Sequence, residues 1–169
     1  MEEEFKILIE YPNYKISNNG KVINRKTGME ITPQMTCSGY YYFQVNKNRI
    51  RHNLYIHKLL GEYFIPNPDN KTIVDHIDRN RSNNQMSNLR WANKSENSIN
   101  CKTRNDNTSG CKGVCYNKRA NMWLARITKN NRTINIGYFK NFEDAIIARN
   151  NKEIEVFGSF IPESINIII

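Results

Sequence analysis

Alternating apolar and polar positions fill the first third of the chain. Residues 14–24 alternate on both sides of Asn19-Gly20, which is a strong two-residue hairpin signal. Residues 40–45 and 50–55 are rich in aromatic and aliphatic side chains and flank Asn46-Lys47-Asn48, where we expect a second hairpin. This pattern predicts a run of short strands.

Helical spacing begins at residue 56. Apolar residues recur there at i, i+3, i+4, i+7 and i+8, which predicts a short amphipathic helix that Pro66 ends. These residues are Ile56, Leu59, Leu60, Tyr63 and Phe64. We expect a brief strand at residues 73–77 and a polar loop at residues 78–84. A second helix is predicted to begin near Asn93 or Ser95, whose side-chain oxygens can cap free N–H groups.

A separate pattern follows residues 105–110, which have the composition of a linker. Strand-like segments lie near 112–116, 122–129 and 132–138, and a helical segment covers about 141–157. The expected apolar side of that helix consists of Phe142, Ala145, Ile146, Ala148 and Val156. These elements predict a small independent module.

The charge of the chain adds a first indication of function. Lys and Arg number 25 against 16 Asp and Glu, so the formal net charge is +9. Residues 15–58 and residues 102–132 each carry +7, whereas residues 59–101 are neutral. Basic segments on both sides of a neutral centre favour a chain that binds nucleic acid around a working centre. Ordinary solvated faces are the alternative.

Other features of the composition narrow the class of protein. No apolar run exceeds four residues, so no transmembrane helix is expected. The first residues are acidic, whereas a secretory signal begins with basic residues. The four cysteines contain no Cys-x-x-Cys pair, which argues against a structural zinc site; they are Cys37, Cys101, Cys111 and Cys115. We therefore expect reduced thiols in a cytoplasmic protein.

Four polar residues near the centre of the chain belong together. Asp75 and His76 lie in the expected strand, Asn88 follows the polar loop, and Asn97 lies on the expected helix. This arrangement resembles the HNH nuclease motif, with His76, Asn88 and Asn97 in its three positions. It is similar in particular to the phage-type HNH homing endonucleases, and the resemblance is strongest over residues 55–100.

The resemblance implies a ββα-metal site. Asp75 and Asn97 would hold one divalent ion, Mg²⁺ or Mn²⁺, His76 would be the general base, and Asn88 would tie the connecting loop. A histidine with a pKa near 6.5 can take a proton from water close to neutral pH. Carboxylate and amide oxygens are hard ligands that suit these ions. The family often has Gly after the second Asp, where this chain has Arg79.

Strand geometry adds an expectation about the two neighbouring residues. Successive side chains on a regular strand point to opposite faces, so Asp75 and His76 face one site only if the strand bends. His57 is either a neighbour of the site or a structural residue, and the structural role is the more common one. His52 is expected to be a residue of a basic strand.

Residues 3–55 resemble the small N-terminal module that often precedes HNH domains, through residues 14–22 and Gly39-Tyr40. The match implies a β-rich element that contacts DNA, and a purely structural set of hairpins is the alternative. The expected phosphate contacts are Lys15, Lys21, Arg25, Lys26, Lys47, Arg49 and Arg51, and Arg90 of the central motif completes this part of the DNA-binding set.

Residues 109–158 resemble the three-stranded DNA-binding domain of the plant APETALA/ethylene-response class. The resemblance rests on residues 113–114, 123–127, 136–139 and 143–145. That class lays its sheet in the major groove, which carries distinguishable base edges. The matching positions imply a DNA face made by Tyr116, Lys118, Arg119, Trp123, Arg126, Thr128, Lys129 and Arg132. For Trp123, a core anchor and a base contact both remain open.

Together these patterns predict an α+β protein of several modules that acts as a homing-type DNA endonuclease of a mobile genetic element. The expected layout is a β-rich module at 1–55, an HNH core at 56–101, a linker at 102–110 and an APETALA-like module at 111–169. Double-stranded DNA is the expected partner, without a membrane, and the chain is expected to act as a monomer that nicks one strand. A non-catalytic DNA-binding regulator with a relic HNH core is the alternative, and an RNA-binding protein is a third interpretation.

Overall fold

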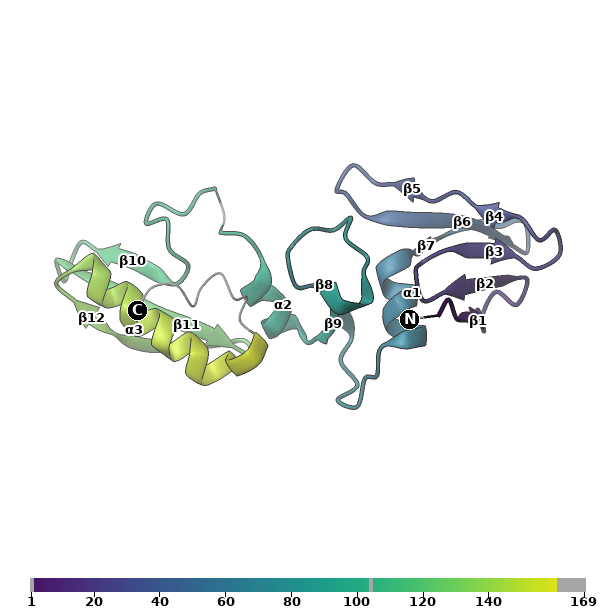
Figure 1. The fold of residues 1–169 in the computed structure, drawn as a ribbon. Helices are drawn as coiled ribbons and strands as arrows, with labels where there is room; N and C mark the ends of the chain where they lie inside the picture. The colour runs from purple at the N-terminus through teal and green to yellow at the C-terminus, as the bar shows by residue number, and fades with distance from the viewer. Residues whose placement is uncertain (1, 104, 161–169) are drawn as a thin grey trace. The chain divides into compact units, whose positions relative to one another are not determined.

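The computed structural model describes residues 2–103 and 105–160, and it divides into two compact units, Met1–Ala92 and Asn93–Ile169 (Figure 1). Both units combine short antiparallel strands with helices, which confirms the predicted mixed α and β composition. Residues 161–169, the predicted end of the last module, lie outside the described residues. Within the described residues, no helix is long and apolar enough to span a membrane.

The first unit holds three small sheets and one α-helix. Strands β1 to β4 form one sheet in chain order, β5 to β7 form a second, and β8 pairs with β9. Helix α1 follows β7 directly. The bounds are β1 Phe5–Ile7, β2 Tyr14–Ser17, β3 Val22–Asn24, β4 Glu30–Ile31, β5 Gln34–Met35, β6 Tyr41–Lys47, β7 Ile50–Tyr55, α1 Ile56–Phe64, β8 Ile73–His76, the 3₁₀ turn η1 Met86–Asn88 and β9 Leu89–Ala92.

The predicted turn at Asn19-Gly20 is confirmed between β2 and β3. Gly20 has φ +83°, and a Cβ there would lie 3.0 Å from Cγ2 of Ile56 in α1, so both backbone and packing favour glycine. The second turn differs from the prediction. Strand β6 extends to Lys47, and the turn lies at Asn48-Arg49, which have φ values of 53° and 63°. A two-residue hairpin turn of type I′ needs two such left-handed residues, and an asparagine tolerates this conformation.

One hydrophobic core joins the β-rich segment to the central part of the chain. Its buried members come from the strands, from α1 and from the residue that follows β1: Leu8, Ile16, Val22, Phe43, Ile56, Leu59, Leu60, Val74 and Leu89. Leu60 of α1 is fully buried, and the helix ends at Phe64, before Pro66, as its spacing predicted. The β8–β9 pair therefore rests on the same core as the N-terminal sheets.

The second unit begins with helix α2 (Lys94–Asn100). Of the two predicted caps, Asn93 is the one used. Its Oδ1 accepts a hydrogen bond from the Glu96 N–H at 3.0 Å, and Glu96 Oε2 accepts one from the Asn93 N–H at 2.7 Å. This reciprocal pair satisfies two N–H groups that a helix leaves free at its start.

Residues from the rest of the second unit hold both ends of α2. The Lys112 ammonium donates hydrogen bonds to the carbonyl oxygens of Ser98, Ile99 and Cys101 at the C-terminal end. Near the other end, the Asn130 N–H donates to Ser95 Oγ at 2.8 Å. Cations and donors at a helix C-terminus satisfy its free carbonyl groups and its dipole. Helix α2 is therefore built into the second unit.

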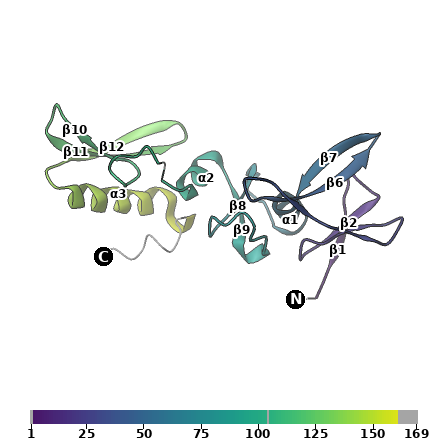
Figure 2. The same cartoon turned by 90° about the horizontal axis from the view of Figure 1, so that it is seen from above.

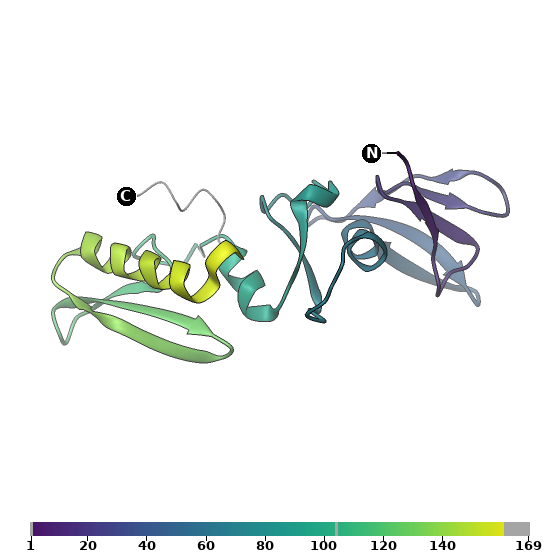
Figure 3. The ribbon, with the colours of Figure 1, turned by 60° about the horizontal axis from the view of Figure 1, so that its bottom comes forward.

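A three-stranded antiparallel sheet and one long helix make up most of the second unit. The sheet runs in the order β10-β11-β12, and α3 lies along one of its faces (Figures 2 and 3). Val114, Ala125 and Ala145 are buried between sheet and helix. The bounds are β10 Val114–Asn117, β11 Met122–Lys129, β12 Arg132–Phe139, α3 Phe142–Phe157 and the 3₁₀ turn η2 Gly158–Phe160.

The buried side of α3 matches the predicted apolar side only in part. Ala145 is buried, and Phe142 and Ile146 pack against the core, as predicted. Ala145, Arg149, Glu153 and Phe157 are its buried residues, at a spacing of four. Arg149 Nη1 lies 2.9 Å from Glu153 Oε2, and their side chains are only 4% and 7% exposed. An apolar pattern cannot reveal a buried ion pair, because both residues count as surface positions in it.

The predicted linker at residues 105–110 is folded onto the start of β10. Ser109 Oγ donates to the Val114 carbonyl at 2.6 Å, and Asn107 Nδ2 donates to the Cys111 carbonyl at 3.1 Å. Side chains that bond to backbone in this way are typical of tight turns. The segment therefore has fixed local structure within the second unit.

Candidate functional site

The central motif lies on the paired strands β8 and β9 and on the loop between them. Asp75 stands opposite Arg90, and His76 stands opposite Leu89. Asp75 is 9% exposed and His76 is 4% exposed, although both are polar. Burial of two adjacent polar residues needs specific partners.

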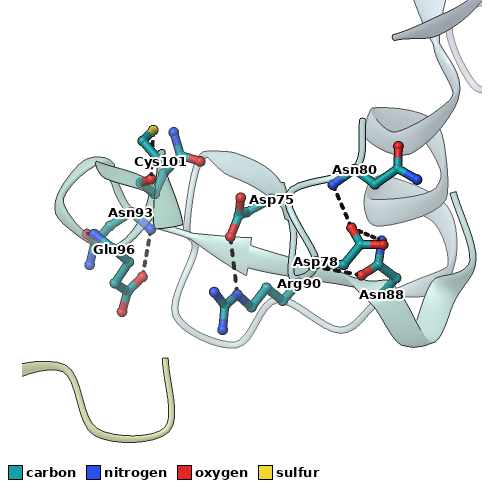
Figure 4. Close-up of polar contacts among 9 residues, drawn as sticks. Asp75, Asp78, Asn80, Asn88, Arg90, Asn93, Glu96 and Cys101 are labelled. Carbon is teal, nitrogen blue, oxygen red and sulfur yellow. Dashed lines mark hydrogen bonds and ion pairs between the residues drawn. The ribbon is translucent and has the colours of Figure 1, made fainter. Parts of the chain in front are cut away.

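The two neighbours have different partners. Arg90 Nε lies 3.3 Å from Asp75 Oδ2 in an ion pair across the strands (Figure 4). His76 Nε2 lies 3.2 Å from Asn84 Oδ1, on the loop.

Aromatic rings surround His76. The ring of His57, the second residue of α1, is 5.1 Å from that of His76, and the ring of Tyr40 is 6.0 Å away. Tyr40 and His57 are themselves 4.9 Å apart. His57 Nδ1 has no hydrogen-bond partner among the described residues. His57 is thus a close neighbour of His76, one of the two roles expected for it.

Asn88 holds the loop between β8 and β9. Its Oδ1 accepts from the Asp78 N–H at 3.0 Å, and its Nδ2 donates to Asp78 Oδ1 at 2.9 Å (Figure 4). Nδ2 also donates to the Asn83 carbonyl at 2.9 Å. An amide side chain can do this because it carries both donors and an acceptor. The ends of the loop are thereby fixed around one buried residue.

The Asp78 carboxylate is fully engaged in the same loop. It accepts from Asn83 Nδ2 and the Asn80 N–H, both at 2.7 Å, as well as from Asn88. Burial works to raise the pKa of Asp78, but these hydrogen bonds outweigh it and lower the pKa below its ordinary value. Asp78 therefore stabilises the conformation of the loop between β8 and β9.

Two arginines shape the loop further. Arg79, where the family often has Gly, has φ +63°, so the left-handed conformation is kept with an arginine. Arg81 lies over the ring of Tyr40 at 4.9 Å, and its Nη1 donates to the Ser38 carbonyl at 3.2 Å. These contacts link the loop to the β5–β6 turn. No local sequence pattern predicts these contacts, because Arg81 and Ser38 are 43 positions apart.

Asn97, the third motif position, lies on α2 and therefore in the second unit, whereas Asp75, His76 and Asn88 lie in the first. The Asn97 side chain is half-buried, and its backbone carbonyl accepts from Cys101 Sγ. Among the described residues, no group of three or more His, Cys, Asp and Glu side chains is placed to hold a metal ion. The predicted metal ligands, Asp75 and Asn97, are only two residues, and one of them is an asparagine. They therefore do not form such a group.

The N-terminal residues predicted to contact phosphate are spread over two sheets. Lys15 lies over the Phe5 ring in the first sheet, Lys21 forms an ion pair with Glu3, and Arg25 donates to the Pro12 carbonyl. Lys26 follows in the turn after β3, and Lys47, Arg49 and Arg51 lie on the β6–β7 hairpin. Of these three, Lys47 lies over the Tyr11 ring, whereas Arg51 is exposed.

The C-terminal residues predicted to contact DNA lie on two faces. Trp123 packs on Phe142 of α3 at 4.5 Å between ring centroids, so the core role applies. Lys129 also faces the helix, because its Nζ donates to the Val156 carbonyl at 2.8 Å. Directly paired residues share a face, which places Tyr116 beside Trp123 and Arg132 beside Lys129. The remaining members of the set are Lys118 and Arg119 in the β10–β11 turn and Arg126 and Thr128 on the opposite, exposed face of β11.

Comparison with known proteins extends this description. The HNH endonuclease family matches residues 54–99. The H-N-H endonuclease F-TflII of Escherichia phage T5 is 30% identical over 122 residues, which cover 70% of this chain and 63% of that protein. An uncharacterized HNH endonuclease of Acanthamoeba polyphaga mimivirus is 37% identical over 97 residues, covering 57% of this chain and 29% of its own length.

A solved structure gives a similar result. The structure described as DNA binding and cleavage by the HNH homing endonuclease I-HmuI aligns with a TM-score of 0.53 and 30% identity, over 57% of this chain and 56% of that one. The chain thus spans less than two thirds of each of these three relatives. The match to the HNH endonuclease family covers Asp75, His76, Asn88 and Asn97 together.

Proposed function

We propose that this chain is a site-directed DNA endonuclease of the homing type, which hydrolyses phosphodiester bonds. One observation carries the proposal: the Asp75-His76 pair is buried at the end of β8, beside a loop tied by Asn88, within the segment that matches the HNH endonuclease family. The similar proteins F-TflII and I-HmuI are named as endonucleases, and the I-HmuI structure is described as one of DNA binding and cleavage.

In this proposal His76 is the general base. Its Nε2 lies 3.2 Å from Asn84 Oδ1, a contact that orients the imidazole ring. An imidazole can take the proton from the attacking water as a general base. The rings of Tyr40 and His57 pack near the imidazole and restrain it as well.

The chemistry of the donor atoms fits a divalent cation. Asp75 and Asn97 would hold one Mg²⁺ or Mn²⁺ through a carboxylate and an amide oxygen, which are ligands that these ions prefer. Asp75 Oδ2 already faces a positive charge in the protein, that of Arg90. Such an ion would neutralise the charge that develops on the phosphate and on the leaving oxygen. Asp78 is not included, because three hydrogen-bond donors occupy its carboxylate.

The exposed face of the β5–β7 sheet is suited to DNA. Cross-strand pairs place Gln34, Tyr42 and Tyr55 in one row, Gln44 and Asn53 in the next, and Asn46 and Arg51 in the third. Phe43 and Val45 point to the opposite face and are buried. The open face therefore carries amide, hydroxyl and guanidinium groups and no carboxylate. Arg, Asn and Gln are the side chains that read base edges in the major groove.

A second DNA-binding surface is proposed on the sheet of the second unit, opposite α3. Arg126 pairs with Asn135 and Thr128 with Thr133 on that face, and Lys118 and Arg119 lie at the adjoining turn. This set replaces the wider one predicted from the sequence, since Trp123 and Lys129 face the helix. The APETALA-like interpretation stays a proposal and rests on the three-strand-and-helix architecture.

The experiment that tests the function uses supercoiled plasmid. We expect the purified chain to convert it to the open circular form in Mg²⁺ or Mn²⁺ and not in EDTA, because one site on a monomer nicks one strand. Linear product at early times would instead indicate a double-strand break. Tight binding without any cleavage in either metal would contradict the proposal and favour the non-catalytic regulator.

A further inference from the structure

Arg90 lies at a position that the nuclease mechanism above does not use. It stands directly opposite Asp75 in the β8–β9 pairing, and its Nε donates to Asp75 Oδ2 at 3.3 Å (Figure 4). Both side chains are shielded from water, with exposures of 17% for Arg90 and 10% for Asp75. The sequence predicted that Arg90 contacts DNA. That role does not explain why its side chain pairs with the carboxylate of Asp75.

Shielding gives this ion pair more weight than a surface pair. The attraction between opposite charges grows as water is excluded. A carboxylate that is nine-tenths buried is costly to leave without a positive partner. In the protein without metal, Arg90 therefore compensates the charge of Asp75 and fixes the position of its carboxylate.

We propose that Arg90 is a positioning residue and the internal counterion of Asp75, and that it weakens the affinity of Asp75 for a divalent cation in the absence of DNA. The inference rests on the proposed function, since it requires Asp75 to be a metal ligand. A guanidinium and a divalent cation that share one carboxylate repel each other. The cation consequently binds less tightly than it would bind to Asp75 without Arg90.

This arrangement would link metal binding to the substrate. DNA phosphates bring negative charge to the site, and that charge offsets the repulsion between Arg90 and the cation. The site would thus take its metal more readily when DNA is bound. Arg90 acts here through Asp75 and not by contact with the reacting phosphate.

The test measures Mn²⁺ binding to the full chain without DNA, from the electron paramagnetic resonance signal of free Mn²⁺. Arg90→Gln should bind Mn²⁺ about tenfold more tightly than the wild type. A factor of about ten corresponds to the repulsion energy of charges of +1 and +2 at about 6 Å in a water-like medium. Arg90→Lys keeps the charge and should stay close to the wild type. Lys58→Gln is the matched control, because it removes one exposed positive charge from the same unit.

Other outcomes overturn the inference. Equal or weaker Mn²⁺ binding by Arg90→Gln, including no measurable binding by either protein, contradicts the counterion role. A loss of duplex affinity in EDTA with unchanged Mn²⁺ binding would show that Arg90 is a phosphate contact after all. A larger rise in melting temperature on adding Mn²⁺ for Arg90→Gln than for the wild type would support the inference independently.

Asp75→Asn separates this inference from the proposed function. If Asp75→Asn does not lower Mn²⁺ affinity, Asp75 is not a ligand and the metal assignment in the proposed function fails. If Asp75→Asn lowers Mn²⁺ affinity while Arg90→Gln leaves it unchanged, the metal assignment stands and only the counterion role fails.

Discussion

His57 is a buried imidazole that the fold accepts in its neutral form only. It is 5% exposed and packs between Tyr40 and His76. Burial, followed by the charges of His76 and Lys58, lowers the pKa of His57 from 6.5 to about 4. His57 Nδ1 is buried and has no hydrogen-bond partner among the described residues, which lowers the free energy of unfolding. An apolar residue at this position would pack without that loss.

This pKa predicts how stability depends on pH. Between pH 6.5 and about 4 the unfolded chain binds a proton at His57 and the folded chain does not, so the free energy of unfolding falls as the pH falls through that window. The loss reaches about 3 kcal/mol at the lower end. Urea unfolding of the wild type and of His57→Phe at pH 7.5, 5.5 and 4.5 measures it. The free energy of unfolding of the wild type should fall relative to that of His57→Phe as the pH falls. A difference between the two free energies that stays constant with pH would contradict the buried, neutral state of His57.

At the scale of elements, α2 depends on residues far from it in the chain. The capping box at Asn93 satisfies its first N–H groups, and Lys112 satisfies carbonyl groups at its other end. With only seven residues, a helix of this length is not stable alone in water. Asn97 is therefore presented on a helix whose stability comes from the second unit.

Substitution of Lys112 tests this dependence. Lys112→Met removes the donors to the last carbonyl groups of α2 and should lower the free energy of unfolding by about 1–2 kcal/mol. Lys118→Met, in the exposed β10–β11 turn, removes the same charge and should change it by less than about 0.5 kcal/mol. Urea unfolding compares the two variants, and equal effects would show that Lys112 does not support the helix.

Much of the element order was predictable because it follows local patterns. Asn19-Gly20 sets its own turn geometry, the spacing of Ile56 to Phe64 defines α1, and Asn93 carries a capping oxygen. The apolar residues before Asp75 also predicted a short strand, and Asp75 and His76 are its last two residues. These features depend on residues within one turn or one strand.

The rest depends on pairings between distant residues. The Asp75–Arg90 ion pair requires the register of β8 with β9, which a loop of irregular structure sets. The buried Arg149–Glu153 pair looks like an exposed helix position in the sequence. Trp123 could be assigned to a face only after its strand was paired and α3 was placed on it. Tertiary contacts of this kind leave no local signal.

For the molecule as a whole, the two basic segments belong to different units. Residues 15–58 lie in the first unit and residues 102–132 in the second, and each segment carries +7. Two weak DNA-binding surfaces on one chain bind more tightly together than either does alone. We therefore expect phosphate contacts of both units to supply much of the DNA affinity and residues 54–99 to supply the chemistry.

Salt dependence measures the contribution of the second unit. Each phosphate contact adds about 0.9 to the slope of log affinity against log salt. The double substitution Lys118→Gln with Arg126→Gln should therefore flatten the slope by about 2 units. Lys140→Gln with Lys152→Gln removes the same charge outside the proposed surface and should change it little. Binding to one duplex in EDTA across a salt series gives both slopes, and identical slopes would mean that this face does not contact DNA.

The central claim is that His76 activates water for DNA cleavage, and the nicking rate of His76→Ala tests it most directly. The rate on supercoiled plasmid in Mg²⁺ should fall by about 10²–10⁴-fold relative to the wild type, because the general base is lost. Duplex affinity measured in EDTA should stay the same, since His76 is buried and belongs to neither proposed DNA-binding surface. A variant that nicks at the wild-type rate with wild-type affinity would contradict the account.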